Sequence, residues 1–397
     1  MTETHTERAS GTRVAKPFLF GLRESVPDSG LLDSRTLFRL AGHNTGNFAF
    51  THAIRRQVVG WGDAIHDGVR ATPDRMREAG DICVIPGANK LGRHADLGKM
   101  AELLEGADMP TVVLSLGAQS SVDYAIPELP EGTVRWVRAV VERSPAGCAN
   151  IGVRGEFSRD VLSAYGFENV RIVGCPSLFL DPSPALGRLI ERNAGAAPRR
   201  VAVAAGGPRW KHLARIEQSL TRMVTTTDGA YVCQAPFAML ALAHGDETEL
   251  GDEVLDACRE YVDREMSMED FGAWVRRFAV AFYDIPEWIE FLRAFDFVVG
   301  TRIHGVLLGL QAGIPALCVV SDSRTRELCE TMAVPHVLAR EHAGGFGREE
   351  LMSVFESQFD GDKFDANRNR LASAYCVLLQ ENRLVPGPAL RELASQP

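Results

Sequence analysis

The sequence of 397 residues lacks several features that would place it in a familiar class. It has no CxxC pair, and its eight cysteines are scattered, which argues against a zinc or redox centre and indicates small buried side chains in a reducing compartment. It has no excess of basic residues, because 43 Lys and Arg stand against 52 Asp and Glu. The net charge of −9 argues against a nucleic acid partner but is compatible with a small anion held by local arginines.

Long apolar runs are also missing. The most apolar stretch, residues 306–320, contains Gln311, Gly313 and Pro315 and is shorter than the roughly 20 residues that a bilayer requires. Residues 1–17 are polar and have no apolar core typical of a secretory signal. We therefore expect a frayed or disordered tail, no transmembrane segment and a cytoplasmic location. No carboxylate cluster has a spacing typical of metal ligands, so neither a metal nor a required cofactor is predicted.

Short apolar runs alternate with helical patterns along most of the chain. Eight runs are predicted to be strands: residues 82–87, 111–117, 170–174, 200–207, 230–236, 278–284, 295–301 and 315–320. Strands that are continuously apolar, with helices between them, are typical of parallel sheets covered on both faces. The pattern predicts an α/β protein with two Rossmann-like domains that face each other across a cleft.

The composition of the chain suggests where these domains begin and end. We expect an N-terminal Rossmann-like domain over residues 18–185 and a C-terminal one over residues 201–345. Residues 186–200, rich in Pro, Gly and Ala, are predicted to be the linker. Two helical patterns within residues 346–397 are expected to pack back on the N-terminal domain.

Arg302 and His304 stand between a predicted strand and a predicted helix that ends near Gly313. Ligands of such sheets bind beyond the carboxyl ends of the strands. There the backbone N–H groups of a helix start, including that of Gly305, favour an anion, and a guanidinium can hold a phosphate or carboxylate bidentately. A histidine, with an ordinary pKa of about 6.5, can exchange a proton with the same ligand. Alternatively, Arg302 binds a neighbouring carbonyl and His304 forms a hydrogen bond in the core.

Polar residues follow other predicted strands in the same way. Residues 37–42, also interpreted as a strand, precede Asn44, Gly46 and Asn47; Ala88, Asn89 and Lys90 follow residues 82–87, and Gln119 follows residues 111–117. Asn and Gly are ordinary turn formers, so each position alone is explained better by a turn than by contact with a ligand. Together they are predicted to line one rim of the cleft.

Arg154 precedes a predicted helix that starts near Ser158, and it either faces the cleft or clamps the turn at residues 174–177. Cys175 is predicted to be structural, because Pro176 follows it and no histidine is near in sequence. Asp284 could orient a base or a sugar hydroxyl, but we favour a role as the N-cap of the next helix.

Two further loops of the second half carry candidate residues. Gly206 and Gly207, with Arg209 close behind, follow a strand and open a helix, so they could admit the phosphate of a donor. Arg324 and Arg326 follow the strand at residues 315–320. They could approach the anion site, but charged helix faces are usually exposed, and we favour solvated side chains.

Several motifs, in their order, give the chain a resemblance to a known family. They are NTGNFAF, IPGANKLG, SLGAQ, IGVRGEFSRDVLSAYGFENVRIVGCPSLFL and FDFVVGTRIHGVLLGLQAGIPALCVVSDSRTRELCETMAVP. Over roughly residues 38–340 the chain resembles the polysaccharide pyruvyl transferase family, with the Arg-X-His element of GTRIHG as the most specific mark. Residues 247–268 match no motif.

The resemblance implies a fold similar to the glycosyltransferase type B architecture and transfer of pyruvate from phosphoenolpyruvate to a sugar as a ketal. It assigns donor recognition and catalysis to Arg302 and His304, which makes the C-terminal domain the donor side and the N-terminal domain the acceptor side. Asn47, Asn89 and Arg154 remain cleft candidates, as does Gln119. The implied partner is a sugar or polysaccharide acceptor, lipid-linked or free.

Our hypothesis is that Arg302 binds the phosphate or carboxylate of the donor, while His304 protonates the methylene carbon or assists departure of phosphate. Two hydroxyls of one sugar then add in turn at the central carbon. One alternative is a nucleotide-sugar-dependent glycosyltransferase on the same scaffold. Another is a non-catalytic relative that binds a glycan. The acceptor sugar, the ketal stereochemistry and the oligomeric state are left open by the sequence.

Overall fold

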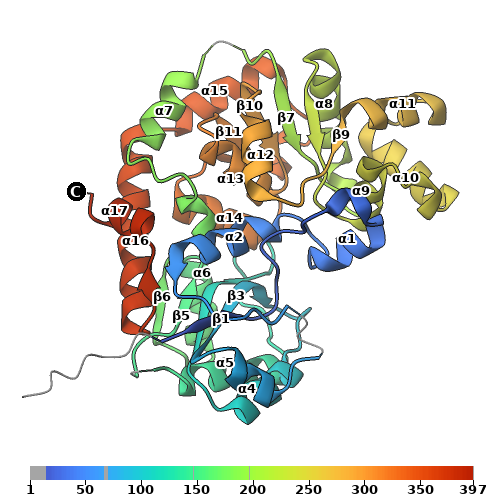
Figure 1. Cartoon of the computed structure of the whole chain (residues 1–397). Coiled ribbons are helices and arrows are strands. Elements are labelled where there is room, and N and C mark those ends of the chain that lie inside the picture. Colours follow the sequence, from blue (N-terminus) through green and yellow to red (C-terminus); the bar gives the residue numbers. More distant parts are fainter. Residues whose placement is uncertain (1–14, 67–69, 146, 196, 397) are drawn as a thin grey trace, which may run out of the picture.

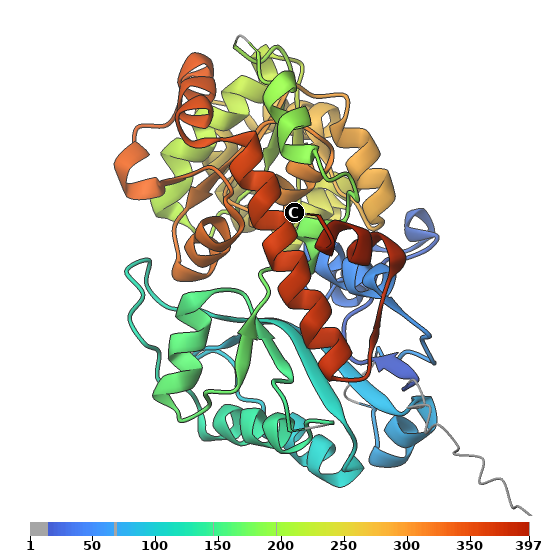
Figure 2. The ribbon, with the colours of Figure 1, turned by 90° about the vertical axis from the view of Figure 1, so that its left-hand side faces the viewer.

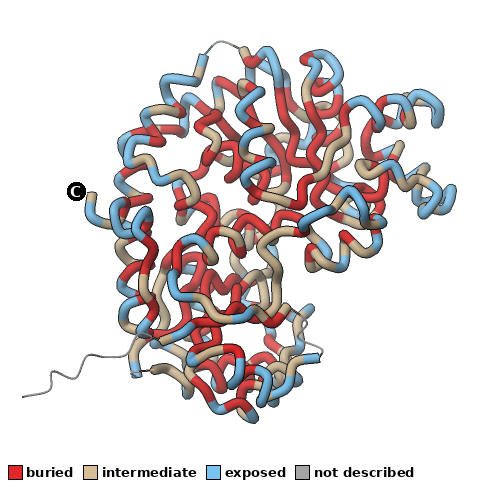
Figure 3. Tube along the Cα trace, in the orientation of Figure 1, coloured by how far each residue is buried: buried red, intermediate tan, exposed pale blue. Residues whose placement is uncertain are grey.

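The computed structural model describes residues 15–66, 70–145, 147–195 and 197–396. Residues 1–14 of the expected tail lie outside this part, and Pro17 already belongs to the first strand. Two parallel sheets, one above the other in Figure 1, form the cores of two domains. Buried residues concentrate along the strands of both sheets and on the helix faces against them (Figure 3).

In the N-terminal sheet each successive strand is added at the same edge. Its order is β1 (Pro17–Leu19), β3 (Ile82–Leu91), β4 (Thr111–Ala118), β5 (Ile151–Val153) and β6 (Val170–Ile172). Because crossovers between parallel strands are right-handed, the last helix before each of β3, β4, β5 and β6 lies on the same face. These helices are α3 (Pro73–Ala79), α4 (Gly98–Ala107), α5 (Glu131–Glu142) and α6 (Glu156–Ala164). Their apolar residues cluster with Cys83 and Ile85, whereas the alternate residues Ile82 and Val84 belong to the other face.

Helices from outside this series cover that other face. They are α2 (Asn47–Gln57), α16 (Gly361–Glu381) and α17 (Pro388–Ala394). Figure 2 shows α16 as a long helix that runs past both domains. A Cβ on Gly152 of β5 would lie 2.7 Å from Leu378 of α16, so the helix packs directly on the sheet. Arg368 of α16 is buried and donates to the carbonyls of the chain segment that connects the domains, at residues 178, 181 and 183.

In the C-terminal sheet all strands are parallel, and successive strands are added first on one side of β7 and then on the other. Its order is β12 (His336–Leu338), β11 (Ala316–Val320), β10 (Phe297–Gly300), β7 (Val201–Ala204), β8 (Ala230–Val232) and β9 (Ala279–Val280). Numbered within the domain, this is the Rossmann order 3-2-1-4-5-6, whose switch point lies between β7 and β10. The surrounding helices are α8 (Ala214–Thr226), α9 (Phe237–His244), α10 (Asp252–Asp263), α11 (Met268–Phe278), α12 (Ile285–Leu292), α13 (Ile303–Gln311) and α14 (Ser323–Met332). The predicted pair of Rossmann-like domains is confirmed.

The interpretation of residues 37–42 as a strand was wrong. They belong mainly to α1 (Ser34–Leu40), which begins where the Asp33 carboxylate accepts a hydrogen bond from the Thr36 N–H at 2.8 Å. The predicted strand at residues 278–284 is reduced to two residues, because α11 continues to Phe278. The predicted N-cap is confirmed, since the Asp284 carboxylate accepts from the Glu287 N–H at 3.1 Å.

The connection between the domains is itself structured. Within residues 186–200, α7 (Leu186–Asn193) packs on α16, and a Cβ on Gly187 would lie 2.2 Å from the carbonyl oxygen of Gly361. The first of the two C-terminal helical patterns, α15 (Arg348–Gln358), lies beside the C-terminal sheet and not, as expected, on the N-terminal domain. In the described parts of the chain, no helix combines the length and apolar character needed to cross a membrane.

Candidate functional site

The switch point places Arg302 and His304 at the carboxyl end of β10. Strands β10 and β7 approach closely there, since a Cβ on Gly300 would lie 2.2 Å from the Ala204 carbonyl oxygen. Arg302 is the residue before α13, and His304 lies in the first turn of that helix. Both side chains therefore stand where a Rossmann sheet ordinarily binds its ligand.

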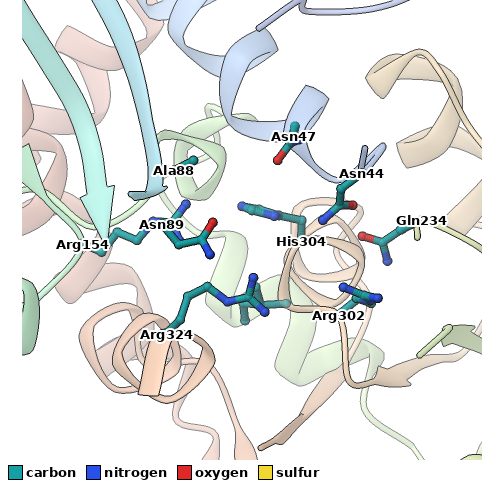
Figure 4. Close-up of a pocket in the computed structure, with 10 residues that line it drawn as sticks. Asn44, Asn47, Ala88, Asn89, Arg154, Gln234, Arg302, His304 and Arg324 are labelled. Atoms are coloured by element: carbon teal, nitrogen blue, oxygen red, sulfur yellow. The ribbon is translucent and has the colours of Figure 1, made fainter. Parts of the chain in front are cut away.

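A small cavity of about 40 Å³ lies in front of these residues, and both domains contribute to it (Figure 4). Its lining consists of Asn44, Asn47, Ala88, Asn89, Arg154, Gln234, Arg302, Ile303, His304 and Arg324. Three of these side chains are guanidinium groups, and no Asp or Glu of the described residues lines the cavity. The arrangement is that of a site for a small, multiply charged anion.

Arg302 is held by its own domain and still has donors to offer. Its guanidinium carbon lies 4.2 Å from the centre of the Trp210 ring, and its Nη2 donates to the Ala235 carbonyl at 3.1 Å. Its Nε is buried and has no hydrogen-bond partner among the described residues. Burial lowers the pKa of Arg302 to about 10, so the group remains charged at neutral pH.

Arg154 and Arg324 approach from opposite domains. Arg154 is buried and its Nε donates to the Ser115 carbonyl at 3.2 Å, so it faces the cavity and does not clamp the turn at residues 174–177. Arg324 pairs with Asp322 at 3.2 Å and has only 19% of its side chain exposed. The preference for a solvated Arg324 was therefore wrong.

Arg326 is only partly exposed, at 28% of its side chain. It forms an ion pair with Glu330 at 2.8 Å and donates to the Val122 carbonyl of the N-terminal domain at 3.0 Å. Arg326 is therefore part of the contact between the domains, not of the cavity.

His304 is only 8% exposed and lies at the centre of this cationic group. Burial lowers its pKa well below the ordinary value, and the charges of Arg154 and Arg324 lower it further. The imidazole is therefore neutral at neutral pH. Its Nε2 lies 3.8 Å from the Sγ of Cys175, and its ring centre lies 5.4 Å from that of Phe50. Cys175 is fully buried, and the histidine beside it comes from a distant part of the sequence.

The asparagines of the predicted rim are largely occupied in shaping the loops. Asn47 donates through Nδ2 to the carbonyls of Ala41 and Gly42, both at 3.1 Å. The Asn44 side chain accepts from the Gly46 N–H at 2.9 Å. A Cβ on Gly46 would lie 3.2 Å from the Cβ of His304, so glycine lets this loop of the N-terminal half approach the catalytic candidate.

The other rim residues lie on β3 and just after β4. Asn89 and Gln119 are joined by a side-chain hydrogen bond, and only Asn89 of the two lines the cavity. The ammonium of Lys90 lies 5.7 Å from the centre of the Trp136 ring and lines a neighbouring, larger cavity. Burial lowers the pKa of Lys90 to about 8.

The glycines predicted to bind the donor lie beside the small cavity. Gly206 donates its N–H to the buried Glu217 carboxylate at 2.9 Å, so that N–H is occupied. Gly207 and Arg209 line an adjoining cavity of about 460 Å³ together with Arg302. Gly305 packs against the strand, since a Cβ there would lie 2.7 Å from the Cβ of Ala204. Contact of these residues with a donor stays a prediction.

Two lining residues were not among the sequence candidates for this site. Gln234 follows β8, and its Nε2 is buried with no partner among the described residues. The rule that ligands bind beyond strand ends could have found it. Ile303 contributes an apolar contact. No group of three or more His, Cys, Asp or Glu within the described residues could hold a metal ion.

Two Rossmann-like domains with a cavity at the switch point are typical of enzymes whose site lies between α/β domains. The family model for polysaccharide pyruvyl transferase matches residues 32–323, well over half of the sequence. The chain belongs to that family and is a transferase.

A search of curated proteins finds no match. Similar solved structures include UDP-GlcNAc 2-epimerase of Methanocaldococcus jannaschii, at 11% identity and a TM-score of 0.44, covering 87% of this chain and 92% of that one. Another is Anabaena Alr3699/HepE with UDP and glucose, at 11% identity and a TM-score of 0.43, covering 93% and 95%. A third is a putative UDP-N-acetylglucosamine 2-epimerase of Listeria monocytogenes, at 12% identity and a TM-score of 0.44, covering 93% and 98%. At these scores the likenesses say nothing about the ligand of this chain.

Proposed function

We propose that this enzyme transfers pyruvate from phosphoenolpyruvate to two hydroxyls of one sugar, forming a ketal and releasing phosphate. The observation that carries the proposal is the convergence of Arg154, Arg302 and Arg324 on His304 in one cavity without a lining carboxylate. Phosphoenolpyruvate presents a phosphate and a carboxylate on adjacent atoms of a three-carbon skeleton. Guanidinium groups that lie close together can form hydrogen bonds to both the planar carboxylate and the tetrahedral phosphate.

Unsatisfied donors in the cavity support an anionic ligand. The Nε atoms of Arg302 and Arg324 and the Nε2 of Gln234 are buried and have no partner among the described residues. Buried polar atoms are normally hydrogen-bonded, because leaving a donor unpaired costs about 1–3 kcal/mol. The oxygens of a bound phosphate or carboxylate would satisfy these donors.

The neutral state of His304 fits a histidine that both accepts and donates a proton. In the reaction, one hydroxyl oxygen bonds to the central carbon while the methylene carbon gains a proton; the second hydroxyl then displaces phosphate. The two hydroxyl protons end on the new methyl group and on the phosphate, so the atoms balance. A bound anion offsets Arg154 and Arg324, raises the pKa of His304 and so makes the imidazolium available when the donor is present.

Phosphate release with phosphoenolpyruvate and a panel of saccharides tests the proposal. A positioned acid or base contributes typically about 10²- to 10⁴-fold, so His304→Ala should lose about that factor in kcat and keep the fold. His212→Ala, at an exposed histidine of the same domain, is the matched control. Near-full turnover of His304→Ala would remove this residue from the mechanism. Tight binding of UDP or GDP, with no binding of phosphoenolpyruvate, would instead support the glycosyltransferase alternative.

A further inference from the structure

A second and much larger cavity adjoins the arginine site. Its volume is about 940 Å³, and it opens at the carboxyl ends of β1 and β3, against the end of α1 and the start of α4. Asn47, Ala88 and Asn89 line both cavities. A molecule that fills the larger cavity therefore extends to the donor site, whereas the small cavity alone has no room for a saccharide.

The lining of this large cavity is cationic in an acidic protein. Arg23, Arg39, Arg70 and Lys90 line it, and no Asp or Glu is found among the described residues of its lining, although the chain has more acidic than basic residues. Arg23 and Arg39 form no ion pair or side-chain hydrogen bond within the described residues. Arg35, one turn before Arg39 on α1, instead pairs with Glu249 at 2.5 Å. Arg23 and Arg39 are thus left without a carboxylate partner within the described part of the chain, whereas Arg35 is paired.

Apolar and polar groups alternate around these cations. Phe20, Leu22 and Met100 supply apolar surface, and the buried Nδ1 of His66 has no partner among the described residues. Sugar rings present apolar faces and polar edges, which suits such a mixed wall. The volume lies within the roughly 300–1,000 Å³ typical of small-molecule sites.

We propose that this cavity is the acceptor subsite and that it takes a saccharide carrying an anionic group, a phosphate, diphosphate or carboxylate. The inference rests on the proposed function, because it assumes that the sugar hydroxyls meet a donor beside Arg302. Arg23 and Arg39 bind the anionic group, and Asn89 lies at the junction where the hydroxyls enter the donor site. A neutral glycan would leave these cations without a partner.

Calorimetric titration of the full chain tests this directly. Arg302→Gln serves as the background, because it weakens the donor site and leaves the large cavity intact. The probes are methyl diphosphate, D-glucuronate and methyl α-D-glucoside. We expect one of the two anionic probes to bind this background at least tenfold more tightly than the neutral glucoside, and the probe that binds identifies the anionic group.

Adding Arg23→Gln and Arg39→Gln to this background should weaken the binding of the anionic probe by about tenfold for each arginine removed, because each substitution removes a hydrogen bond to a charged group. Adding Arg35→Gln, the matched control on the same helix, should leave the affinity unchanged. Absence of anion binding, equal binding of the glucoside, or no loss in the double substitution would each overturn the inference. Titration of the wild type with phosphoenolpyruvate is read separately, so failure of the donor proposal is distinguishable.

Discussion

Glu327 joins the two domains next to the arginine site and makes their association sensitive to pH. Its carboxylate, on α14, accepts hydrogen bonds from the N–H and the hydroxyl of Ser158, on α6 of the other domain, at 2.6 and 2.7 Å. The side chain is only 2% exposed. Burial raises its pKa to about 7, although the hydrogen bonds from Ser158 and the charge of Arg154 act in the opposite direction.

The sign of the effect follows from proton linkage. The folded-state pKa of Glu327 lies above its unfolded value of 4.5, so the native protein binds the extra proton more tightly. The resulting stabilisation is fully present below the unfolded pKa and is lost as the pH rises through about 7. A difference of 2.5 pKa units corresponds to about 3 kcal/mol, of which about 2.5 kcal/mol is lost between pH 5 and pH 9.

Glu327→Gln keeps the shape of the side chain and removes this titration. We expect its free energy of unfolding, relative to the wild type, to rise by about 2.5 kcal/mol between pH 5 and pH 9. Urea unfolding followed by tryptophan fluorescence at both pH values measures this difference. Glu330→Gln, one turn further along α14 at a carboxylate with 41% exposure, controls for loss of a negative charge. A wild-type-minus-variant difference that is the same at both pH values would refute the reasoning.

Three further predictions concern the ligand sites. Arg302→Lys should weaken the binding of phosphoenolpyruvate by about 10- to 100-fold in a calorimetric titration, because lysine cannot present a bidentate fork while stacked on Trp210. Arg326→Lys should leave this affinity unchanged. The kcat/KM for an anionic acceptor should fall through about pH 8 as Lys90 loses its proton, and Lys90→Arg should abolish that fall. Binding of phosphoenolpyruvate near pH 7 should take up a proton at His304, measured as a binding enthalpy that depends on the ionisation enthalpy of the buffer, and His304→Gln should remove the uptake.

Much of the fold could be predicted because the informative patterns are local. Strands such as Phe297–Gly300 and Ala316–Val320 are buried on both faces and are therefore continuously apolar. The position of a residue in the first turn after such a strand can also be predicted from the neighbouring sequence, and this position made Arg302 and His304 candidates. The three-residue strands β1, β5 and β12 escaped notice, because three residues show too little of a pattern and their pairing depends on strands distant in sequence. The equally short β6 and β8 were found only as parts of the longer predicted runs 170–174 and 230–236.

Arg324 shows what local patterns miss. In sequence it belongs to a charged helix start, between Asp322 and Arg326, which is typical of a solvated surface. Its burial arises only because the loop after β4 packs on α14, where the Ser120 N–H donates to the Ser323 hydroxyl at 2.8 Å. Sequence cannot specify that contact between domains, so it could not decide which of the two arginines faces the ligand.

The three arginines are held in place by contacts with the protein itself. Like charges repel, and Arg324 contributes to the lowered pKa of both Arg302 and Arg154. Each guanidinium is nevertheless anchored within its own domain: Arg154 by the Ser115 carbonyl, Arg302 by the Trp210 ring and Arg324 by the Asp322 carboxylate. The contacts within each domain therefore offset the repulsion between these three charges during folding. Binding energy is then available for the ligand itself, since preorganised donors lose little conformational entropy on association.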